Sequence, residues 1–483
     1  MKIKYFLLFF AVLSLFAIPV SAGAVSACGM LSSSNTVYTL TQSVSSSGTC
    51  FNVTAEGITL DCNGFSVTGN NTPGTAGLYS NKPGTTVKNC NILGYDKNIY
   101  LDSNSNFNTL SNINASSSNA STYSTAIYLF SSFSNNFTNI RITSSRLYGI
   151  DLEQYSSNNI FTNINIDSNG DGVKLRSGFN NSFTNINVKS DNGRDIYLIS
   201  SSTYNTFTNV NSGYSGIYLQ GGCNYNTFSN INVTAHTNGI DLASSSNNSF
   251  MDTNVNSSAH GMTLDHSNGN NFTDMNITSA LDGIRLSSSS DNIIANSSIR
   301  VGASAIVFFS SSSRNIIYNN TLVSNGVVFS DLVDIFRSSS GNLFYWNNFT
   351  NTLGYYVRDE TGGNFYNTTI NGKPAGNIWY NVVSGFILIN GTAPSPFPGL
   401  YYGSSGLAYP YNSANSQRKL SGDVVDYGPL VPSASVQSAI RAKNMAELTT
   451  GFGDLALICG AVVIIALVLL LIIYLVFFRR RKQ

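Results

Sequence analysis

The stretch GIDLEQYSSNNIFTNINIDSNGDGVKLRSGFNNSFTNINVKS, residues 149–190, contains one pattern twice. Gly149-Ile150-Asp151-Leu152 returns as Gly172-Val173-Lys174-Leu175, and Asn159-Ile160-Phe161 returns as Asn181-Ser182-Phe183. Apolar and polar residues alternate within each run, which is typical of a β-strand with one buried face. Clusters of Ser, Asn and Gly separate the runs and favour tight turns. Each repeat is therefore predicted to contain short strands joined by turns.

The pattern recurs along most of the chain at intervals of about 22 residues. One column of apolar residues comprises Phe137, Phe161, Phe183, Phe207, Phe228, Phe250, Phe272, Ile294, Ile317 and Phe344. An asparagine stands two positions before each of them, at Asn135, Asn159, Asn181, Asn205, Asn226, Asn248, Asn270, Asn292, Asn315 and Asn342. A repeat this short cannot bury its own apolar face, so we expect successive repeats to stack on one another.

Stacked repeats of this kind predict an all-β fold, a right-handed parallel β-helix solenoid with coils of about 22 residues. Ile150 and Leu152 then point into the core. The asparagines are expected to turn inward and to hydrogen-bond along the axis, because a side-chain amide both donates and accepts. A leucine-rich-repeat solenoid would need a Leu and Asn spacing that is absent, and β-propeller blades are about twice as long.

Both ends of the chain have the composition of targeting segments. Lys2 and Lys4 precede an apolar run and small residues, which predicts a signal peptide over 1–22. Leu455–Phe478 contains no charged residue and predicts a transmembrane helix. The basic residues of 479–483 follow directly, so we expect a cytoplasmic tail and a single-pass protein of the cell surface whose N-terminal part lies outside.

Only 10% of the residues are charged and the formal net charge is +1. This composition argues against nucleic acid as a partner, because the sequence offers no basic patch to neutralise phosphates. Asn-x-Ser/Thr sequons are frequent in a chain so rich in Asn and Ser. Those we take as candidate N-glycosylation sites are Asn52, Asn114, Asn136, Asn232, Asn276, Asn348, Asn367 and Asn390.

The sequence resembles the right-handed parallel β-helix superfamily, which has the pectin-lyase-like fold, and in particular the NosD-like and archaeal-type surface β-helix proteins. The Gly-Ile-x-Leu and Asn-x-Phe repeats carry the resemblance, together with Gly48-Thr49-Cys50-Phe51 and Asp426-Tyr427-Gly428-Pro429-Leu430. It implies the fold but not one activity, because the superfamily includes polysaccharide lyases, hydrolases, epimerases and adhesins. The NosD-like members imply a further alternative, an accessory role in the maturation of exported metalloproteins.

Four cysteines lie in the first repeats, at Cys28, Cys50, Cys62 and Cys90. Residues one coil apart stack within disulfide range, so the spacing predicts the pairs Cys28–Cys50 and Cys62–Cys90. Such bonds protect the exposed end of a β-helix and suit an oxidising compartment. A metal site is the alternative for these cysteines, but no closely spaced Cys pair supports it, and we expect no bound metal.

The repeat pattern also divides the chain. We expect an N-terminal cap and first coils over 28–97, regular coils over 98–350, and final coils with an aromatic C-terminal cap over 351–432. A polar connector over 433–454 then leads to the apolar segment.

One face of the predicted rod gathers acids, bases and tyrosines. Its ligand-binding candidates are Tyr128, Lys174, Tyr197, Tyr218 and Arg285. Its candidate carboxylates are Asp151, Glu153, Asp241 and Asp265, which could form pairs for glycoside hydrolysis. Outward positions of any exposed sheet are polar, and the motifs of galacturonan hydrolases are absent.

Three functions remain open on these residues. The first is a membrane-anchored surface protein with a structural, adhesive or glycan-recognition role, binding surface glycans or other surface proteins without a cofactor. The second is a surface-tethered polysaccharide lyase or glycoside hydrolase, for which a calcium ion is the expected cofactor of a lyase. The third is the NosD-like accessory role.

Overall fold

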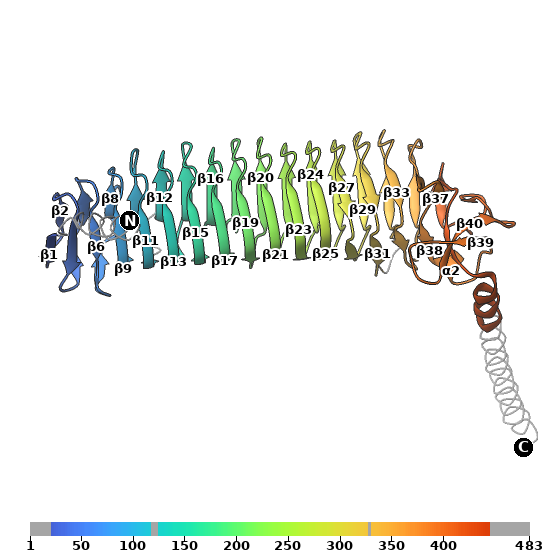
Figure 1. Ribbon diagram of the computed structural model, residues 1–483, viewed down its shortest axis with the longest axis horizontal. Helices are drawn as coiled ribbons and strands as arrows, with labels where there is room; N and C mark the ends of the chain where they lie inside the picture. The colour runs from blue at the N-terminus through green and yellow to red at the C-terminus, as the bar shows by residue number, and fades with distance from the viewer. Residues whose placement is uncertain (1–20, 117–123, 327–329, 445–483) are drawn as a thin grey trace, which may run out of the picture.

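The computed structural model describes residues 21–116, 124–326 and 330–444, which form an elongated rod of stacked coils (Figure 1). The described part contains about 14 turns of about 23 residues each. Two long sheets line the rod, one of 24 strands, here called sheet A, and one of 16 strands, here called sheet B. The predicted parallel β-helix is confirmed.

Sheet B is parallel throughout. Its strands are β2 (Gly29–Leu31), β5 (Phe51–Val53), β8 (Ala76–Ser80), β10 (Lys97–Leu101), β12 (Thr125–Phe130), β14 (Tyr148–Glu153), β16 (Asp171–Arg176), β18 (Ile196–Ile199), β20 (Ile217–Gln220), β22 (Ile240–Ala243), β24 (Met262–Asp265), β26 (Ile284–Ser287), β29 (Ile306–Phe309), β32 (Val333–Ile335), β35 (Val357–Asp359) and β42 (Leu420–Gly422).

Sheet A is parallel until its C-terminal end, where β39 and β40 pair antiparallel. Its strands are β1 (Ser21–Val25), β3 (Thr36–Leu40), β4 (Val44–Ser45), β6 (Thr59–Asp61), β7 (Ser66–Thr68), β9 (Thr86–Leu93), β11 (Thr109–Ser116), β13 (Asn136–Ser145), β15 (Ile160–Ser168), β17 (Ser182–Ser190), β19 (Thr206–Ser212), β21 (Thr227–Ala235), β23 (Ser249–Ser257), β25 (Asn271–Ser279), β27 (Ile293–Ala295), β28 (Ser298–Val301), β30 (Ile316–Tyr318), β31 (Thr321–Ser324), β33 (Leu343–Tyr345), β34 (Asn348–Phe349), β38 (Ile378–Trp379), β39 (Asn390–Pro394), β40 (Leu400–Ser405) and β44 (Leu430–Pro432).

Small elements complete the C-terminal end. They are the hairpin β36 (Thr368–Ile370) and β37 (Lys373–Ala375), the pair β41 (Tyr411–Asn412) and β43 (Val425–Asp426), and the short helix α2 (Tyr380–Val383). A further helix covers residues 434–444.

Glycine begins the Gly-Ile-x-Leu pattern because the next coil leaves no room for a side chain. A Cβ atom on Gly172 would collide with Val188 and with the backbone carbonyl of Asp195. Gly149, Gly239, Gly261 and Gly283 meet equivalent obstacles in their own coils. The residues that follow, such as Ile150 and Leu152, are buried and stack on their counterparts in the neighbouring coil.

The phenylalanine column forms the centre of the core. The rings of Phe137, Phe161 and Phe183 lie parallel, with centroids 4.5 and 4.6 Å apart. The stack continues through Phe207, Phe228 and Phe250, all completely buried. From Phe161 to Phe250 each ring is covered on both faces by an identical ring, so the core has the same cross-section from coil to coil over this part of the rod.

The asparagine column forms a ladder of buried amides at the turns from sheet B to sheet A. Asn159 Nδ2 donates to Asn181 Oδ1 at 3.0 Å, and the backbone N–H of Asn159 donates to the same oxygen. The ladder is longer than the ten predicted members, because Asn108 precedes it and Asn364 extends it. It satisfies turn N–H groups that would otherwise be buried without a partner.

Both predicted disulfides are present. Cys28 and Cys50 are bonded with Cα atoms 4.6 Å apart, and Cys62 and Cys90 with Cα atoms 4.8 Å apart. These distances are the separation of adjacent coils. The bonds place this domain in an oxidising compartment outside the cytosol. Cys223 is a free buried thiol.

The C-terminal coils are closed by aromatic side chains. Trp379 is completely buried between Phe349 and Tyr411, at centroid distances of 4.3 and 5.1 Å. A second amide ladder, which the sequence analysis missed, runs from Asn320 through Asn347 to Asn377 and ends on the buried carboxylate of Asp426.

The predicted targeting segments fall mostly outside the described residues. Ser21 and Ala22, the end of the predicted signal peptide, lie in β1, which pairs with β3, while residues 1–20 are not described. The predicted transmembrane helix 455–478 and the tail 479–483 also lie outside. Within the described ranges no helix is long and apolar enough to span a membrane.

Candidate functional site

The outer face of sheet B, here called the lateral face, brings the predicted site residues into one column. Tyr128 pairs with Asp151, Asp151 with Lys174, and Lys174 with Tyr197. The column continues through Tyr218, Asp241 and Thr263 to Arg285. The register of the parallel strands therefore confirms the predicted alignment, although the side chains differ widely in their exposure.

The most buried charges of this face belong to Asp151 and Lys174. Both residues are only 3% exposed. Lys174 Nζ lies 3.4 Å from Asp151 Oδ1 and 2.9 Å from Glu153 Oε1, and 4.0 Å from the centre of the Tyr148 ring. Because its ammonium group is fully occupied by these partners, Lys174 is not free to contact a ligand in this arrangement.

Burial raises the pKa of Asp151 to about 7, against the opposing attraction of Lys174. Apart from the ion pair with Lys174, its Oδ1 has no hydrogen-bond donor among the described residues. A buried carboxyl group with a pKa near neutrality can take up or release a proton at physiological pH, as a general acid or base must. Lys174 forms ion pairs with both Asp151 and Glu153, and these two carboxylates make a candidate catalytic pair.

The second predicted carboxylate pair is not joined by any interaction within the described residues. Asp241 accepts hydrogen bonds from Thr263 and from Asn238. Asp265 is largely exposed and contacts His266, with 3.0 Å between Oδ1 and Nδ1. Each carboxylate thus has its own local partners.

Three groups along the lateral face combine aromatic rings with a cation. In the first, Tyr79, Tyr100 and Tyr128 follow one another at centroid distances of 5.2 and 5.1 Å. Lys97 Nζ lies 5.3 Å from the centre of the Tyr128 ring. Lys97 is also paired with Asp96, so this group carries no net positive charge.

The second group consists of Tyr197, Tyr218 and Arg194. The Arg194 guanidinium lies 4.1 Å from the centre of the Tyr197 ring and 5.1 Å from that of Tyr218. Tyr197 donates its hydroxyl hydrogen to Gln220 Oε1 at 2.9 Å. Both tyrosines are partly exposed, which fits their predicted place on a binding face.

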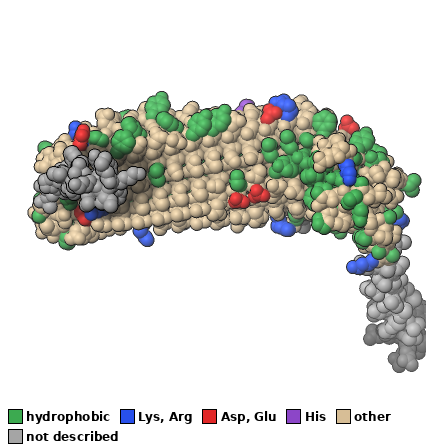
Figure 2. Space-filling model, viewed as in Figure 1, with side chains coloured by type: hydrophobic (Ala, Val, Ile, Leu, Met, Phe, Trp, Pro, Cys, Tyr) green, Lys and Arg blue, Asp and Glu red, His purple; other side chains and the backbone are tan. Residues whose placement is uncertain are grey.

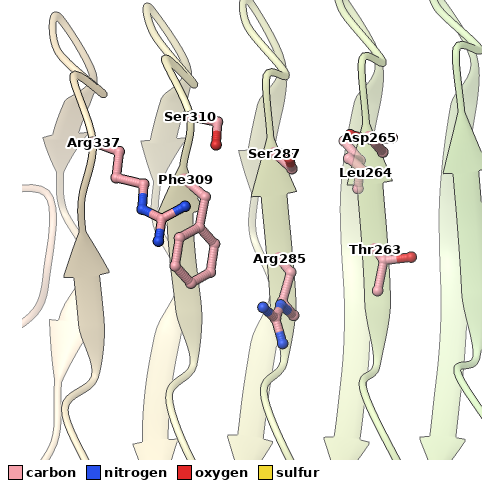
Figure 3. Close-up of a pocket in the computed structure, with 8 residues that line it drawn as sticks. All are labelled: Thr263, Leu264, Asp265, Arg285, Ser287, Phe309, Ser310 and Arg337. Atoms are coloured by element: carbon pink, nitrogen blue, oxygen red, sulfur yellow. The ribbon is translucent and has the colours of Figure 1, made fainter.

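The third group surrounds a depression of about 390 Å³ at the C-terminal part of the lateral face. Figure 3 shows the Phe309 ring between Arg337 and Arg285, with Asp265 and Thr263 two coils away from Phe309. The Arg285 guanidinium lies 5.1 Å from the centre of that ring. Phe336 stacks behind Phe309 at 5.5 Å.

The two arginines of this third group differ in whether they have an acidic partner. Arg285 has Asp282 at 3.5 Å and the His260 ring at 3.2 Å. Arg337 is exposed and forms no ion pair with any described residue. Arg358, further along, is instead neutralised by Asp331 and Asp334. The depression therefore offers an aromatic surface and one cation without an acidic partner.

The sequence analysis named Arg285 but missed Phe309 and Arg337. Phe309 continues the column Asp265–Ser287, so the sequence contained a signal for it. Arg337 lies in the turn after β32, where the other coils mostly have Ser, and only the three-dimensional path of the turn brings it to Phe309.

The candidate glycosylation sites are distributed over several coils. Four are exposed, namely Asn136, Asn232, Asn276 and Asn390. Four are partly buried, namely Asn52, Asn114, Asn348 and Asn367. Their glycosylation stays a prediction.

The fold and the matched segments together define the class of this protein. Residues 114–254 match the family model described as right handed beta helix region. The chain belongs to the right-handed parallel β-helix superfamily. More particularly, residues 186–334 match the model described as periplasmic copper-binding protein (NosD). No curated protein matches the chain.

Solved structures with a similar fold have low sequence identity to this chain. The periplasmic alginate epimerase AlgG is 11% identical, with 68% of this chain and 75% of that chain covered and a TM-score of 0.36. The Azotobacter vinelandii mannuronan C-5 epimerase AlgE6 A-module is 12% identical, with 63% and 88% covered and a TM-score of 0.35. The Dettilon tailspike protein is 13% identical, with 70% and 61% covered and a TM-score of 0.33.

The description of the NosD family names copper, for which the described residues do not provide a fitting site. Copper in proteins is bound by clustered His, Cys and Met side chains. His236 packs on Tyr214, and His260 lies beside the Arg285 guanidinium, whose charge would repel a metal ion. Cys223 is buried and donates to the carbonyl of Gln220. No group of three or more His, Cys, Asp or Glu able to hold a metal occurs among the described residues.

Proposed function

We propose that this protein is a rigid rod, displayed outside the cytosol, that recognises acidic polysaccharides on its lateral face. The observation that carries the proposal is the arrangement of Arg285, Phe309 and Arg337 around one depression. The C–H surface of a sugar ring can pack on Phe309, and a carboxylate or sulfate on the sugar can accept hydrogen bonds from the guanidinium groups.

The charge distribution supports an acidic ligand over a neutral one. Arg337 has no acidic partner within the described residues, so binding an anion would not require an existing ion pair to break. Guanidinium groups favour planar anions because they present several donors in a fixed geometry. The lateral face also continues past Tyr197 and Tyr218, which could hold further units of the same chain.

The site of display follows from the sequence and the disulfides. The two disulfides of the first coils suit an exported domain, and we propose that residues 455–478 anchor the rod in the membrane. A rod of stacked coils would then lie outside the cell, where glycans of the surroundings are accessible to its lateral face.

One observation favours a second function, a polysaccharide lyase or glycoside hydrolase. Asp151 combines deep burial, a pKa of about 7 and a neighbouring carboxylate, Glu153, held by the same lysine. These features suit proton transfer, but the carboxyl group is paired with Lys174 and Asp151 is only 3% exposed. We therefore rank recognition first.

A combined binding and product assay tests both proposals. The full-length chain in non-ionic detergent is incubated with polygalacturonate, alginate, a sulfated glycan and neutral dextran. Recognition at the lateral face predicts retention by the acidic polymers that weakens at about 1 M salt, because screening removes the attraction of exposed charges. New reducing ends or unsaturated products that disappear in Asp151→Asn would establish the enzyme instead.

A further inference from the structure

Six exposed aromatic side chains form a row along the edge where sheet B turns into sheet A. One of them stands on each of six consecutive turns, and these residues are between 40% and 67% exposed: Phe107, Phe133, Tyr155, Phe179, Tyr204 and Tyr225. These turns stand at the upper edge of the rod in Figure 1, and Figure 2 shows hydrophobic side chains along that edge over its N-terminal half. We call this set the aromatic row.

The backbone at four of these positions disfavours an aromatic residue, and one of them is Tyr155, with a φ angle of 66°. Phe107, Tyr204 and Tyr225 have φ angles of 57°, 57° and 58° and directly precede a ladder asparagine. The equivalent position in other coils is filled by Asn180, Asn247 or Gly269, which tolerate this left-handed conformation better. An aromatic ring here therefore carries a conformational cost in every folded molecule.

Burial does not offset this cost, because the rings face solvent. Tyr204 and Tyr225 stack on each other at 5.1 Å, and Phe107 contacts Phe133 at 5.9 Å. These ring contacts offset only part of the conformational cost. Tyr155 is 67% exposed and contacts no other ring among the described residues. A strained and exposed aromatic is better explained by binding than by folding.

The turns that carry the row have almost no charge. The five turns over 131–135, 154–159, 177–181, 200–205 and 221–226 contain no Asp, Glu, Lys or Arg. Their remaining residues are mainly Ser, Asn and Gly. Such a surface offers apolar rings next to neutral hydrogen-bonding groups, in contrast to the cationic depression at Arg337.

We propose that the aromatic row binds a neutral polysaccharide that runs parallel to the rod. A polymer with a regular repeat matches a row that supplies one ring per coil, because coils recur at about 4.8 Å. The rings contact the C–H faces of sugars, and the serine and asparagine side chains bind their hydroxyl groups. This site is separate from the acidic site on the lateral face and does not depend on it.

The test is the double variant Tyr204→Asn and Tyr225→Asn in the full-length chain. Asparagine is well suited to the left-handed position, so we expect an unchanged or higher melting temperature. Affinity electrophoresis through gels containing dextran, soluble mannan or hydroxyethyl cellulose measures binding. We expect at least one of these neutral polymers to retard the wild type, independently of salt, and the variant to bind about tenfold more weakly. Asn247→Ser is the matched control, since it changes the same turn position without removing a ring.

Three results would overturn the proposal. One is wild-type protein that migrates equally in gels with and without each neutral polymer. Another is equal retardation of the double variant. The third is a change in oligomeric state or a large fall in melting temperature in the variant, which would assign the row to self-association or to folding. As long as the double variant keeps the fold and oligomeric state of the wild type, retention by polygalacturonate at the lateral face should be unaffected, so the two proposals fail separately.

Discussion

Asn181 Nδ2 donates to Asn205 Oδ1 at 3.0 Å, and the backbone N–H of Asn181 donates to the same oxygen at 3.0 Å. Asn181 Nδ2 also donates to the carbonyl of Ser156, in the preceding coil. One side chain therefore links three successive coils and leaves none of these buried groups without a partner. The ladder joins the turns in the same way that backbone hydrogen bonds join the strands.

The first prediction concerns this ladder. Asn181→Ala removes the acceptor of two donors, the backbone N–H and the Nδ2 group of Asn159. Each buried donor without a partner costs about 1–3 kcal/mol, so we expect the local free energy of opening to fall by about 3 kcal/mol. Hydrogen exchange at the turns of residues 156–160 should accelerate by about 100-fold. Asn187→Ala is the control, because the Asn187 amide bonds to Asn165 on the exposed face; an equal effect of both variants would contradict the structural role of the ladder.

The second prediction concerns the disulfides. Cys62→Ser together with Cys90→Ser should destabilise the first coils by about 2–5 kcal/mol, because the open chain gains conformational freedom. Thermal unfolding of the variant followed by limited proteolysis would locate the loss at the N-terminal end. In the native wild type, iodoacetamide should label neither these residues nor Cys223, which is completely buried. Rapid labelling of any of the five described cysteines under native conditions would be inconsistent with this arrangement.

The third prediction concerns pH. Burial raises the pKa of Asp151 from its ordinary value near 3.8 to about 7. The folded state therefore binds more protons than the unfolded state between these values, and the stability that this carboxyl contributes falls as pH rises from about 4 to 7. Asp151→Asn should reduce the decline in melting temperature over this range, to which the buried Asp426, whose pKa is also raised to about 7, contributes as well. Asp191→Asn, at an exposed acid, should leave the decline unchanged. A decline of equal slope in wild type and Asp151→Asn would show that Asp151 is not a titrating group.

The fourth prediction concerns the anchor. Residues 455–478 are expected to hold the chain in the membrane, so full-length protein should resist extraction with alkaline carbonate. A chain that ends at residue 454 should be released in soluble form with both disulfides intact. A C-terminal tag that is absent from the mature membrane protein would show that the tail is removed instead.

The fold could be predicted from the sequence because the residue pattern of one coil recurs many times along the chain. Gly172 and Phe183 recur in phase along the chain, and stacking identical residues is the simplest way to bury them. The cysteine spacing likewise gave the correct pairs, since the coil length was already known from the repeat. The second ladder through Asn320 and Asn347 was missed because asparagine is too common for a column of three to stand out.

The candidate site was less predictable because exposure depends on packing that the repeat does not determine. Asp151 and Lys174 were expected on an outward face, which is correct, but both are buried, and the Lys174 ammonium group contacts Tyr148 and Glu153. The aromatic row was missed because its members precede the ladder asparagine by different numbers of residues, one at Tyr204 and four at Tyr155. Turns of different length place these rings on the same edge.

The most direct test of acidic polysaccharide recognition is the affinity of the Arg337→Gln variant for polygalacturonate, measured by calorimetry with the full-length chain in detergent. Removing this guanidinium should weaken binding about tenfold and reduce its salt dependence, since a charge-assisted hydrogen bond contributes about 1.5–3 kcal/mol. Arg314→Gln is the matched control, because Arg314 is also exposed, on a neighbouring turn, but is paired with Asp291. The account predicts a loss in Arg337→Gln alone; equal affinities of the wild type and both variants, or no binding by the wild type, would contradict it.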